Sequence, residues 1–193
     1  MTTETLPLFP LNTVLFPGGR VPLRIFEPRY LDLVRDSSRA GSGFGICLIL
    51  EGQEAGAAAL PAAYGCEARI VDFSTTDQGL LGIVVEGARR FRVERSKVRD
   101  NGLVVAEVVW QHATPAQRVR PEHELLATLL QRLLDRADVP FEKNALADAD
   151  WVGWRLAEWL PLAMAERQSL LQENEPHRRL QFLLEQLPRF QPE

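Results

Sequence analysis

The residues that are able to support catalysis are few and scattered along this chain. Its three histidines stand at positions 112, 123 and 177, and none of them follows a nucleophile elbow or a paired-carboxylate motif. Catalysis by a triad requires a nucleophile, a histidine and an orienting group that the fold brings together. We therefore expect surface or helix-capping histidines and no catalytic residue, and a small-molecule hydrolase is the weakest alternative.

The motifs that bind nucleotides or form a serine–lysine pair are also missing. A P-loop needs a glycine-rich turn followed by Lys and Ser or Thr, but the chain has no Gly-Lys dipeptide, and its glycine-rich stretch 41–45 leads into a strand-like run. Ser96 and Lys97 are neighbours on a predicted strand, where adjacent side chains point to opposite faces and cannot share a proton. No cofactor is expected.

The two cysteines offer little redox or metal chemistry. Cys47 and Cys66 each lie in an apolar run, and no Cys-x-x-Cys pair is present. The sequence favours two reduced, buried cysteines that behave as small hydrophobic residues, with a disulfide as the alternative. Because cysteines and histidines lack the spacing of a zinc site, no metal centre is expected.

The first candidate binding surface lies near the N-terminus, where aromatic residues alternate with prolines and charges. Strands broken by proline leave backbone groups unpaired, so an extended peptide can add to them while the aromatic rings hold its apolar side chains. The alternative is structural: the rings close the end of a barrel, and Arg24, Glu27 and Arg29 form an ion-pair cluster. The candidate residues are Phe9, Phe16, Arg24, Phe26, Glu27, Arg29 and Tyr30.

A second candidate is a basic strand that would bind RNA. Six cations lie between positions 89 and 99, with Phe91 among them: Arg89, Arg90, Arg92, Arg95, Lys97 and Arg99. Strand alternation places Phe91 and Val93 on one face and Arg90 and Arg92 on the other, so the ring would be buried and unable to stack on a base. A solvated strand face is the preferred interpretation.

A third candidate is an exposed indole on the helix that carries Trp151, Trp154 and Trp159. The alternative is that all three tryptophans belong to the core of a helical bundle.

These candidates are positioned by two segments of different periodicity. Residues 6–111 are rich in short apolar or alternating runs, with an Asn-Gly turn at 101–102 and one helix over 28–37, which predicts a compact, mostly antiparallel barrel of about six strands. After residue 112, apolar residues recur at three- and four-residue steps and predict helices over 121–136, from Asp148 or Asp150 to 160, over 165–172 and over 176–187. We expect an α+β protein with a β-rich subdomain over 1–112 and a helical subdomain over 113–193.

The bulk composition is that of an ordinary globular protein. Hydrophobic residues make up 46% and charged residues 25% of the 193 residues, and the net charge is −4. This charge does not attract the whole molecule to nucleic acid or to an anionic membrane. The N-terminus lacks the basic start and apolar core of a signal peptide, and no apolar run is long enough to span a bilayer, so we expect a cytoplasmic location.

Three segments together resemble the N-terminal substrate-recognition domain of Lon-type ATP-dependent proteases, in its short stand-alone bacterial form. They are LPLFPLNTVLFPGGRVPLRIFEPRY at 6–30, GLLGIVVEGARRFRV at 79–93 and ERQSLLQENEPHRRLQFLLEQL at 166–187. The resemblance implies a PUA-like pseudo-barrel followed by a small helical bundle. It also implies recognition of unfolded or extended polypeptides, with a protease or chaperone as a further partner.

The same resemblance also indicates which activities to expect. In Lon proteases the ATPase and the Ser–Lys peptidase lie on separate downstream domains, which a chain of 193 residues is too short to include. The resemblance to the peptidase S16 family therefore concerns the name and not peptidase activity. We expect a non-catalytic protein-binding module, with RNA binding through the basic strand as the alternative.

Overall fold

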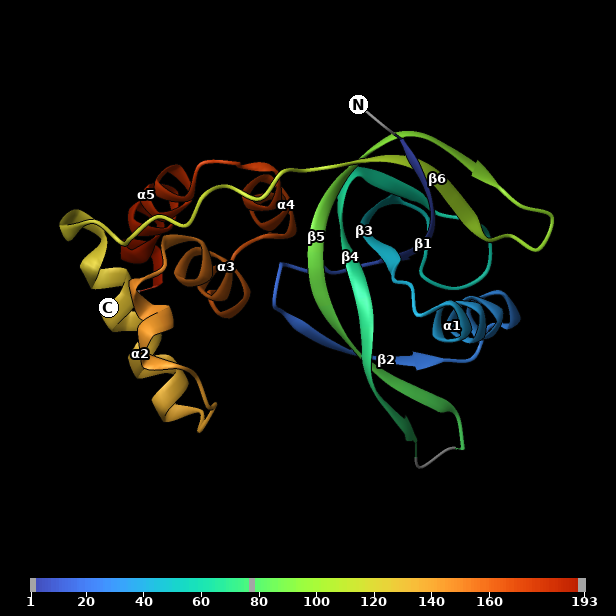
Figure 1. The fold of residues 1–193 in the computed structure, drawn as a ribbon, viewed down its shortest axis with the longest axis horizontal. Helices are drawn as coiled ribbons and strands as arrows, with labels where there is room; N and C mark the ends of the chain where they lie inside the picture. Colours follow the sequence, from blue (N-terminus) through green and yellow to red (C-terminus); the bar gives the residue numbers. More distant parts are fainter. Residues whose placement is uncertain (1–2, 77–78, 191–193) are drawn as a thin grey trace. The chain divides into compact units, whose positions relative to one another are not determined.

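The computed structural model describes residues 3–76 and 79–190 (Figure 1). The chain divides into two compact units, Met1–His112 and Ala113–Glu193, and each is described by itself. No helix in the described part of the chain is both long and apolar enough to cross a membrane.

Unit 1 is built on one mixed sheet with a single helix. Its order is β2-β5-β4-β3-β1-β6, with a further pairing between β5 and β6. Only β1 and β3 run parallel among these pairings, which agrees with the α+β class and the mostly antiparallel sheet that the sequence predicts. The elements are β1 (Glu4–Leu11), β2 (Arg20–Ile25), α1 (Pro28–Ala40), β3 (Phe44–Glu51), β4 (Leu60–Thr75), β5 (Leu81–Val98) and β6 (Val104–Trp110).

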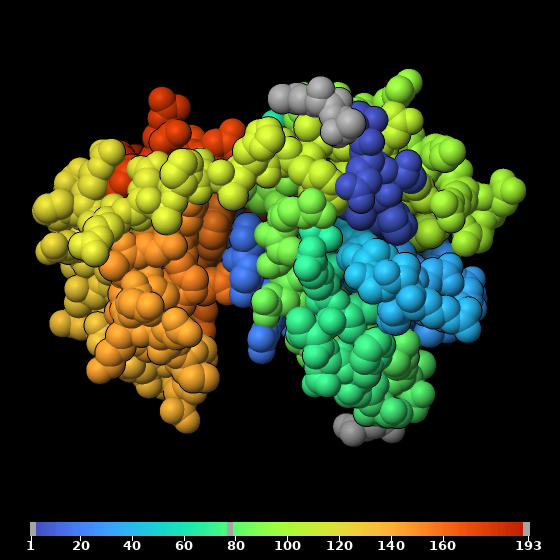
Figure 2. All heavy atoms as spheres, viewed as in Figure 1, coloured from blue at the N-terminus to red at the C-terminus, as the bar shows by residue number. Residues whose placement is uncertain are grey.

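The long strand β5 joins the parts of this sheet. Its first half pairs with both β2 and β4, and its second half pairs with β4 and β6, so that β5, β4, β3, β1 and β6 form a closed circuit of pairings. The sequence predicted separate short strands here, but β4 and β5 are continuous across register shifts, which bend a strand without ending it. The end of β4 and the beginning of β5, which pair with each other, extend past the rest of the unit (Figure 1). They form its lower surface in Figure 2, in green.

Gly87 explains how β5 passes the segment before β2. A Cβ atom at this position would overlap the carbonyl oxygen of Phe16, so only glycine allows the two backbones to approach. The backbones are then joined by hydrogen bonds from Gly18 N–H to the Gly87 carbonyl (2.7 Å) and from Gly87 N–H to the Gly19 carbonyl (2.8 Å). The apolar run at 14–16, which the sequence pattern suggests as a short strand, does not form one.

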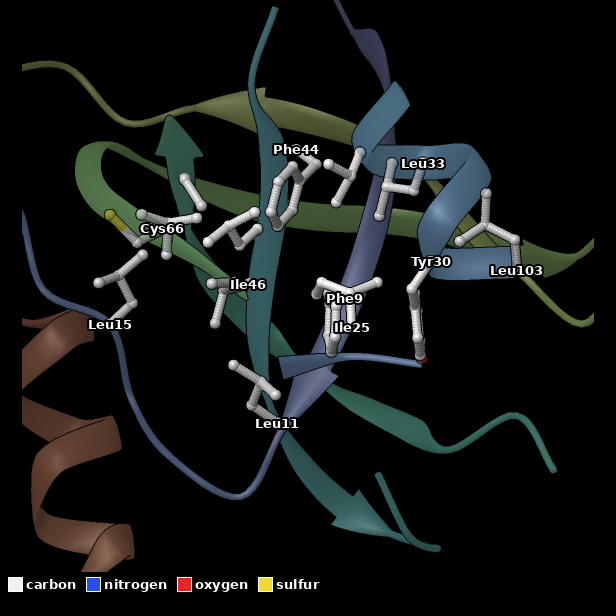
Figure 3. Close-up of a cluster of buried hydrophobic side chains, with 14 of the residues drawn as sticks. Phe9, Leu11, Leu15, Ile25, Tyr30, Leu33, Phe44, Ile46, Cys66 and Leu103 are labelled. Carbon is white, nitrogen blue, oxygen red and sulfur yellow. The ribbon is translucent and has the colours of Figure 1, made fainter. Parts of the chain in front are cut away.

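The apolar side chains of unit 1 form two clusters. The larger one gathers Phe9, Ile25, Tyr30, Phe44 and neighbouring residues between the sheet and α1 (Figure 3). The smaller cluster, which includes Leu8 and Phe91, contains Cys47, whereas Cys66 belongs to the larger cluster. Both cysteines are buried and neither forms a disulfide, and burial raises the pKa of the Cys47 thiol, so Cys47 does not have the character of a reactive thiol.

The described residues of unit 2 contain four α-helices, and the connection between the first two, residues 137–148, includes a 3-10 helix at Lys143–Ala147. Leu126, Leu130 and Leu134 form the buried stripe of α2, as the sequence periodicity predicts. Asp148 caps α3, because its carboxylate accepts hydrogen bonds from the backbone N–H groups of Asp150 (2.8 Å) and Trp151 (3.3 Å). The helices are α2 (Glu124–Arg136), α3 (Ala149–Trp159), α4 (Met164–Gln172) and α5 (Pro176–Gln186).

Two residues of unit 2 differ from what the sequence suggested. His123 is buried and its ring stacks on that of His177, with centroids 5.6 Å apart, so the expectation of a surface or capping histidine is wrong for His123. Arg179 is fully buried as well: it forms an ion pair with Asp150, donates to the Glu173 carbonyl (2.7 Å) and lies over the Trp154 ring at 3.3 Å. Trp154, which contacts Arg179, is itself buried and is a core residue, whereas Trp159 is 38% exposed.

Candidate functional site

An open groove of about 520 Å³ lies in unit 1, between the end of β1, the strand β2 and the first turn of α1. Most of the side chains that line it are apolar, and three are charged. The lining residues are Phe9, Leu11, Pro22, Leu23, Arg24, Phe26, Glu27, Tyr30, Glu54, Ala55 and Leu80. Five of the seven candidate residues from the N-terminal segment are therefore brought together: Phe9, Arg24, Phe26, Glu27 and Tyr30.

The floor of the groove is a pair of stacked aromatic rings. Phe9 on β1 and Tyr30 on α1 have centroids 3.9 Å apart and planes inclined by 12°, and both residues are buried. Figure 3 shows Tyr30 reaching from α1 towards the region of Phe9 and Ile25. Burial raises the pKa of the Tyr30 hydroxyl, so the floor is uncharged at neutral pH and suits an apolar side chain.

The rim of the groove carries an exposed aromatic ring. Phe26 lies in the short break between β2 and α1, and 57% of its surface is exposed. The helix that follows begins at Pro28, whose fixed φ suits the first turn, and this start directs the chain away from β2 directly after Phe26. A large apolar side chain that is exposed beside an apolar groove is a common feature of binding sites.

One part of the predicted charged cluster has a structural role. Arg29 is only 6% exposed; it pairs with Glu27 at 2.9 Å and donates a hydrogen bond to the Gly102 carbonyl at 2.9 Å. These contacts connect the start of α1 to the β5–β6 turn. Arg24 differs from Arg29, because it is exposed and has no ion-pair partner among residues 3–76 and 79–190.

Phe16 also differs from its expected role. Its side chain is fully buried, and its carbonyl accepts a hydrogen bond from Gly19 N–H at 2.9 Å. Because the ring is fully buried, it cannot contact a bound molecule in this conformation. Phe16 and Arg29 are therefore left out of the contact surface proposed below.

Sequence reasoning missed six of the lining residues, and three of these six come from segments distant from the N-terminal one. Glu54 and Ala55 belong to the glycine- and alanine-rich loop after β3, and Leu80 precedes β5. The Glu54 carboxylate accepts a hydrogen bond from the backbone N–H of Asn12 at 2.6 Å, which attaches this loop beside the end of β1. The only sequence signal for this part of the groove was Glu54, an acidic residue within a run rich in glycine and alanine.

The basic strand does not present a continuous charged strip. Arg89 pairs with Glu67 at 2.9 Å and lies over the Trp110 ring at 3.8 Å. Arg92 pairs with Glu94 at 2.5 Å, and Arg95 pairs with Glu107 at 3.0 Å. Since neighbouring carboxylates neutralise these arginines, the main observation in favour of RNA binding is lost.

The predicted alternation of buried and exposed side chains along the same strand is wrong at Arg90. Phe91 is buried as expected, but Arg90 is buried too. The β4–β5 ladder shifts register between Cys66 and Ala68, next to Arg90, and strict alternation of faces holds only for a regular strand.

In the described part of the chain, no group of three or more His, Cys, Asp or Glu side chains is arranged to hold a metal ion.

Comparison with known proteins relates this chain to Lon proteases. The family model of the ATP-dependent protease La (LON) substrate-binding domain matches residues 5–189. Lon protease 2 of Myxococcus xanthus is 36% identical over 93 residues, and Lon protease of Anaeromyxobacter dehalogenans (strain 2CP-C) is 34% identical over 91 residues. These matches cover 47% and 46% of this chain but only 11% of each relative.

Solved structures extend the likeness to nearly the whole chain. A crystal structure of a Lon N-terminal domain protein from Xanthomonas campestris is 54% identical with a TM-score of 0.80, and the match covers 98% of this chain and 99% of that one. The N-terminal domain of the Mycobacterium avium complex Lon protease has a TM-score of 0.67 at 20% identity, with 94% and 97% covered, and shows the shared fold. The chain therefore belongs to the LON substrate-binding domain family.

Proposed function

We propose that this chain is a non-catalytic module that binds unfolded or extended polypeptide segments in the groove between β1, β2 and α1. The observation that carries the proposal is the exposed Phe26 ring beside an open groove whose floor is the stacked pair of Phe9 and Tyr30. Unfolded chains differ from folded ones in exposing large apolar side chains, and a concave apolar site accepts such side chains.

Family membership supports the same proposal. The matching family is described as a substrate-binding domain, and the curated relatives are Lon proteases, of which the chain matches a small part. We propose that the chain recognises polypeptides without ATPase or peptidase activity of its own. Delivery of the bound polypeptide to a protease or chaperone in the cytoplasm is part of this proposal.

The fold resemblance gives the proposal its architecture. We propose that the circuit of strands in unit 1 is a PUA-like pseudo-barrel and that unit 2 is a helical bundle, as separate subdomains over 1–112 and 113–193. The pairing of β5 with both β4 and β6 supports the first assignment. The buried leucine stripe of α2 and the buried ion pair of Arg179 and Asp150 support the second.

The experiment that tests this function is a titration of the whole chain with a fluorescently labelled, reduced and carboxymethylated model protein. Saturable binding is expected, and Phe26→Ala should weaken it about tenfold, as the loss of a large apolar contact does. Phe73→Ala is a matched control, because Phe73 is 54% exposed but does not line the groove. Absence of binding, or equal effects of both substitutions, contradicts the proposal.

A further inference from the structure

One wall of the groove is a strand with a free edge. β2 pairs with β5 along one side, and among the described residues no strand pairs with its other side. β2 stands at one end of the strand order of the sheet. Pro22 and Arg24 on this strand line the groove, and no backbone hydrogen bond from a turn or loop in 3–76 or 79–190 reaches them.

The hydrogen bonds at the start of β2 define which of its residues face this free edge. Gly87 N–H donates to the Gly19 carbonyl at 2.8 Å, so position 19 faces β5. In an antiparallel ladder the backbone groups of alternate residues point to opposite sides. Positions 21, 23 and 25 therefore face β5, in the register that pairs Leu23 with Ile83. The residues whose backbone groups face the free edge are Arg20, Pro22 and Arg24.

The proline fits this assignment. Pro22 has no N–H to donate, and proline is tolerated in sheets where its nitrogen faces away from the ladder. The free edge thus offers both a donor and an acceptor at Arg24 but only an acceptor at Pro22. This is enough for an added strand to pair with, while the missing donor discourages uncontrolled pairing of edges.

Another side of the groove is formed by the end of β1, where this strand still pairs with β3. β1 pairs with β6 only from Glu4 to Leu8. At Phe9 and Leu11, the side of β1 that would continue towards β6 therefore has no partner strand in the described part of the chain. The side chains of Phe9 and Leu11 line the groove. A segment seated there would lie between two strand ends, with alternate side chains directed at the apolar floor.

The charges of the groove indicate what should flank the apolar side chain. Among the lining residues Glu27 is paired with Arg29, and Glu54 accepts the Asn12 N–H. Arg24 is the one charged lining residue for which the described residues provide no partner. A guanidinium prefers a carboxylate partner, so a bound segment with an acidic side chain beside its apolar residue matches the site.

We propose that the free edge of β2 receives an extended, proline-free segment as an additional strand, with a large apolar side chain in the groove and an adjacent carboxylate at Arg24. This inference rests on the proposed function and adds to it the mode of binding and the class of segment. The site then recognises a backbone conformation that folded proteins conceal within their own sheets, together with a short side-chain pattern.

The test uses synthetic nine-residue peptides with a central Phe flanked by either Glu or Lys, titrated against the whole chain. The Glu-flanked peptide should bind about two- to fivefold more tightly, the range expected for an exposed ion pair. Arg24→Glu should reverse this preference. Arg39→Glu makes the same charge change at an exposed position of α1 outside the groove and should leave the preference unchanged. An Arg24→Glu variant with unchanged preference overturns the charge assignment.

Backbone pairing is tested by N-methylation of single peptide bonds along the same peptide. Strand addition predicts an alternating pattern, with about tenfold loss where the amide faces β2 and little loss at the next position. Peptide binding that is insensitive to N-methylation overturns strand addition but leaves the proposed function standing. If neither peptides nor the unfolded protein bind, the proposed function itself fails. A dimer in analytical ultracentrifugation that dissociates on Arg24→Glu shows that a second copy fills the edge, which also overturns this inference.

Discussion

Phe9 and Tyr30 stack with ring centroids 3.9 Å apart, although one belongs to β1 and the other to α1. This pair closes the larger apolar cluster of unit 1 at the floor of the groove. The same contact therefore stabilises the fold and shapes the candidate site. Changes to these two rings separate the two roles.

Phe9→Ala should lower the free energy of unfolding by about 3 kcal/mol, because it removes a buried ring and leaves a cavity under Tyr30. Tyr30→Phe keeps the stacked ring and should change stability by less than about 1 kcal/mol. Urea denaturation followed by circular dichroism measures both values. Equal losses for the two variants would show that the stacked pair does not support the core in this way.

Arg179 should be the most sensitive charged residue of unit 2. Arg179→Ala removes the buried partner of Asp150 and the contact with Trp154, and the loss of one member of a buried ion pair costs about 3–5 kcal/mol. Arg179→Lys keeps the charge but not the planar fork, so its effect should be intermediate. Tryptophan fluorescence during denaturation reports this change, since Trp151, Trp154 and Trp159 belong to unit 2. Arg155→Ala, at a more exposed ion pair with Glu158, is the comparison and should cost less.

His177 predicts a pH dependence of stability. Burial lowers the pKa of His177, and the electrostatic effects of the neighbouring Arg120 and His123 lower it further. The unfolded state then takes up a proton at higher pH than the folded state, so the free energy of unfolding should fall as pH decreases through about 6.5. Glu158 acts in the opposite direction: burial raises its pKa to about 7, and its contribution to stability is lost as pH rises.

The contribution of His177 is isolated by comparing His177→Gln with the parent chain in urea denaturation at pH 7.5 and pH 5.5. The parent should lose more stability than the variant over this interval, because the variant lacks the titrating ring. If the parent and the variant lose the same free energy of unfolding between pH 7.5 and pH 5.5, or if the variant loses more, the assigned direction of the pKa shift is wrong.

Pro22 should limit the pairing of the β2 edge. Pro22→Thr adds an N–H group that faces the groove, so extended peptides should bind more tightly and the chain should self-associate more at high concentration. Fluorescence anisotropy and analytical ultracentrifugation measure these two effects. Pro115→Thr changes an exposed proline outside the sheet and should alter neither. Weaker peptide binding by Pro22→Thr would indicate that the proline ring itself contacts the peptide.

Local sequence signals predicted the elements well, because apolar periodicity and proline or glycine breaks act over short distances. The helix α1 begins at the predicted Pro28 and ends at Ala40, three residues later than expected, and is followed by Gly41 in the left-handed region. The continuity of β5 was missed because it follows from the pairing of this strand with β2, β4 and β6. Pairing between distant segments is not encoded in a local pattern.

The groove was predictable only in part for the same reason. Phe9, Phe16 and Phe26 have the same residue type in similar proline-rich surroundings, yet Phe16 is fully buried and Phe26 is 57% exposed. Arg24 and Arg29 are likewise indistinguishable by pattern, but only Arg29 meets the Gly102 carbonyl. Glu54 and Leu80 reach the groove through tertiary contacts that no spacing in the sequence reveals.

The proposed function requires an unfolded polypeptide to contact the groove at Phe26. A photo-reactive benzoylphenylalanine placed at position 26, and in a second variant at position 73, tests this contact directly in the whole chain. After illumination with the carboxymethylated model protein, mass spectrometry of crosslinked peptides should show efficient crosslinks from position 26 and few from position 73. Equal crosslinking from both positions, or crosslinks from position 73 alone, would contradict polypeptide binding in this groove.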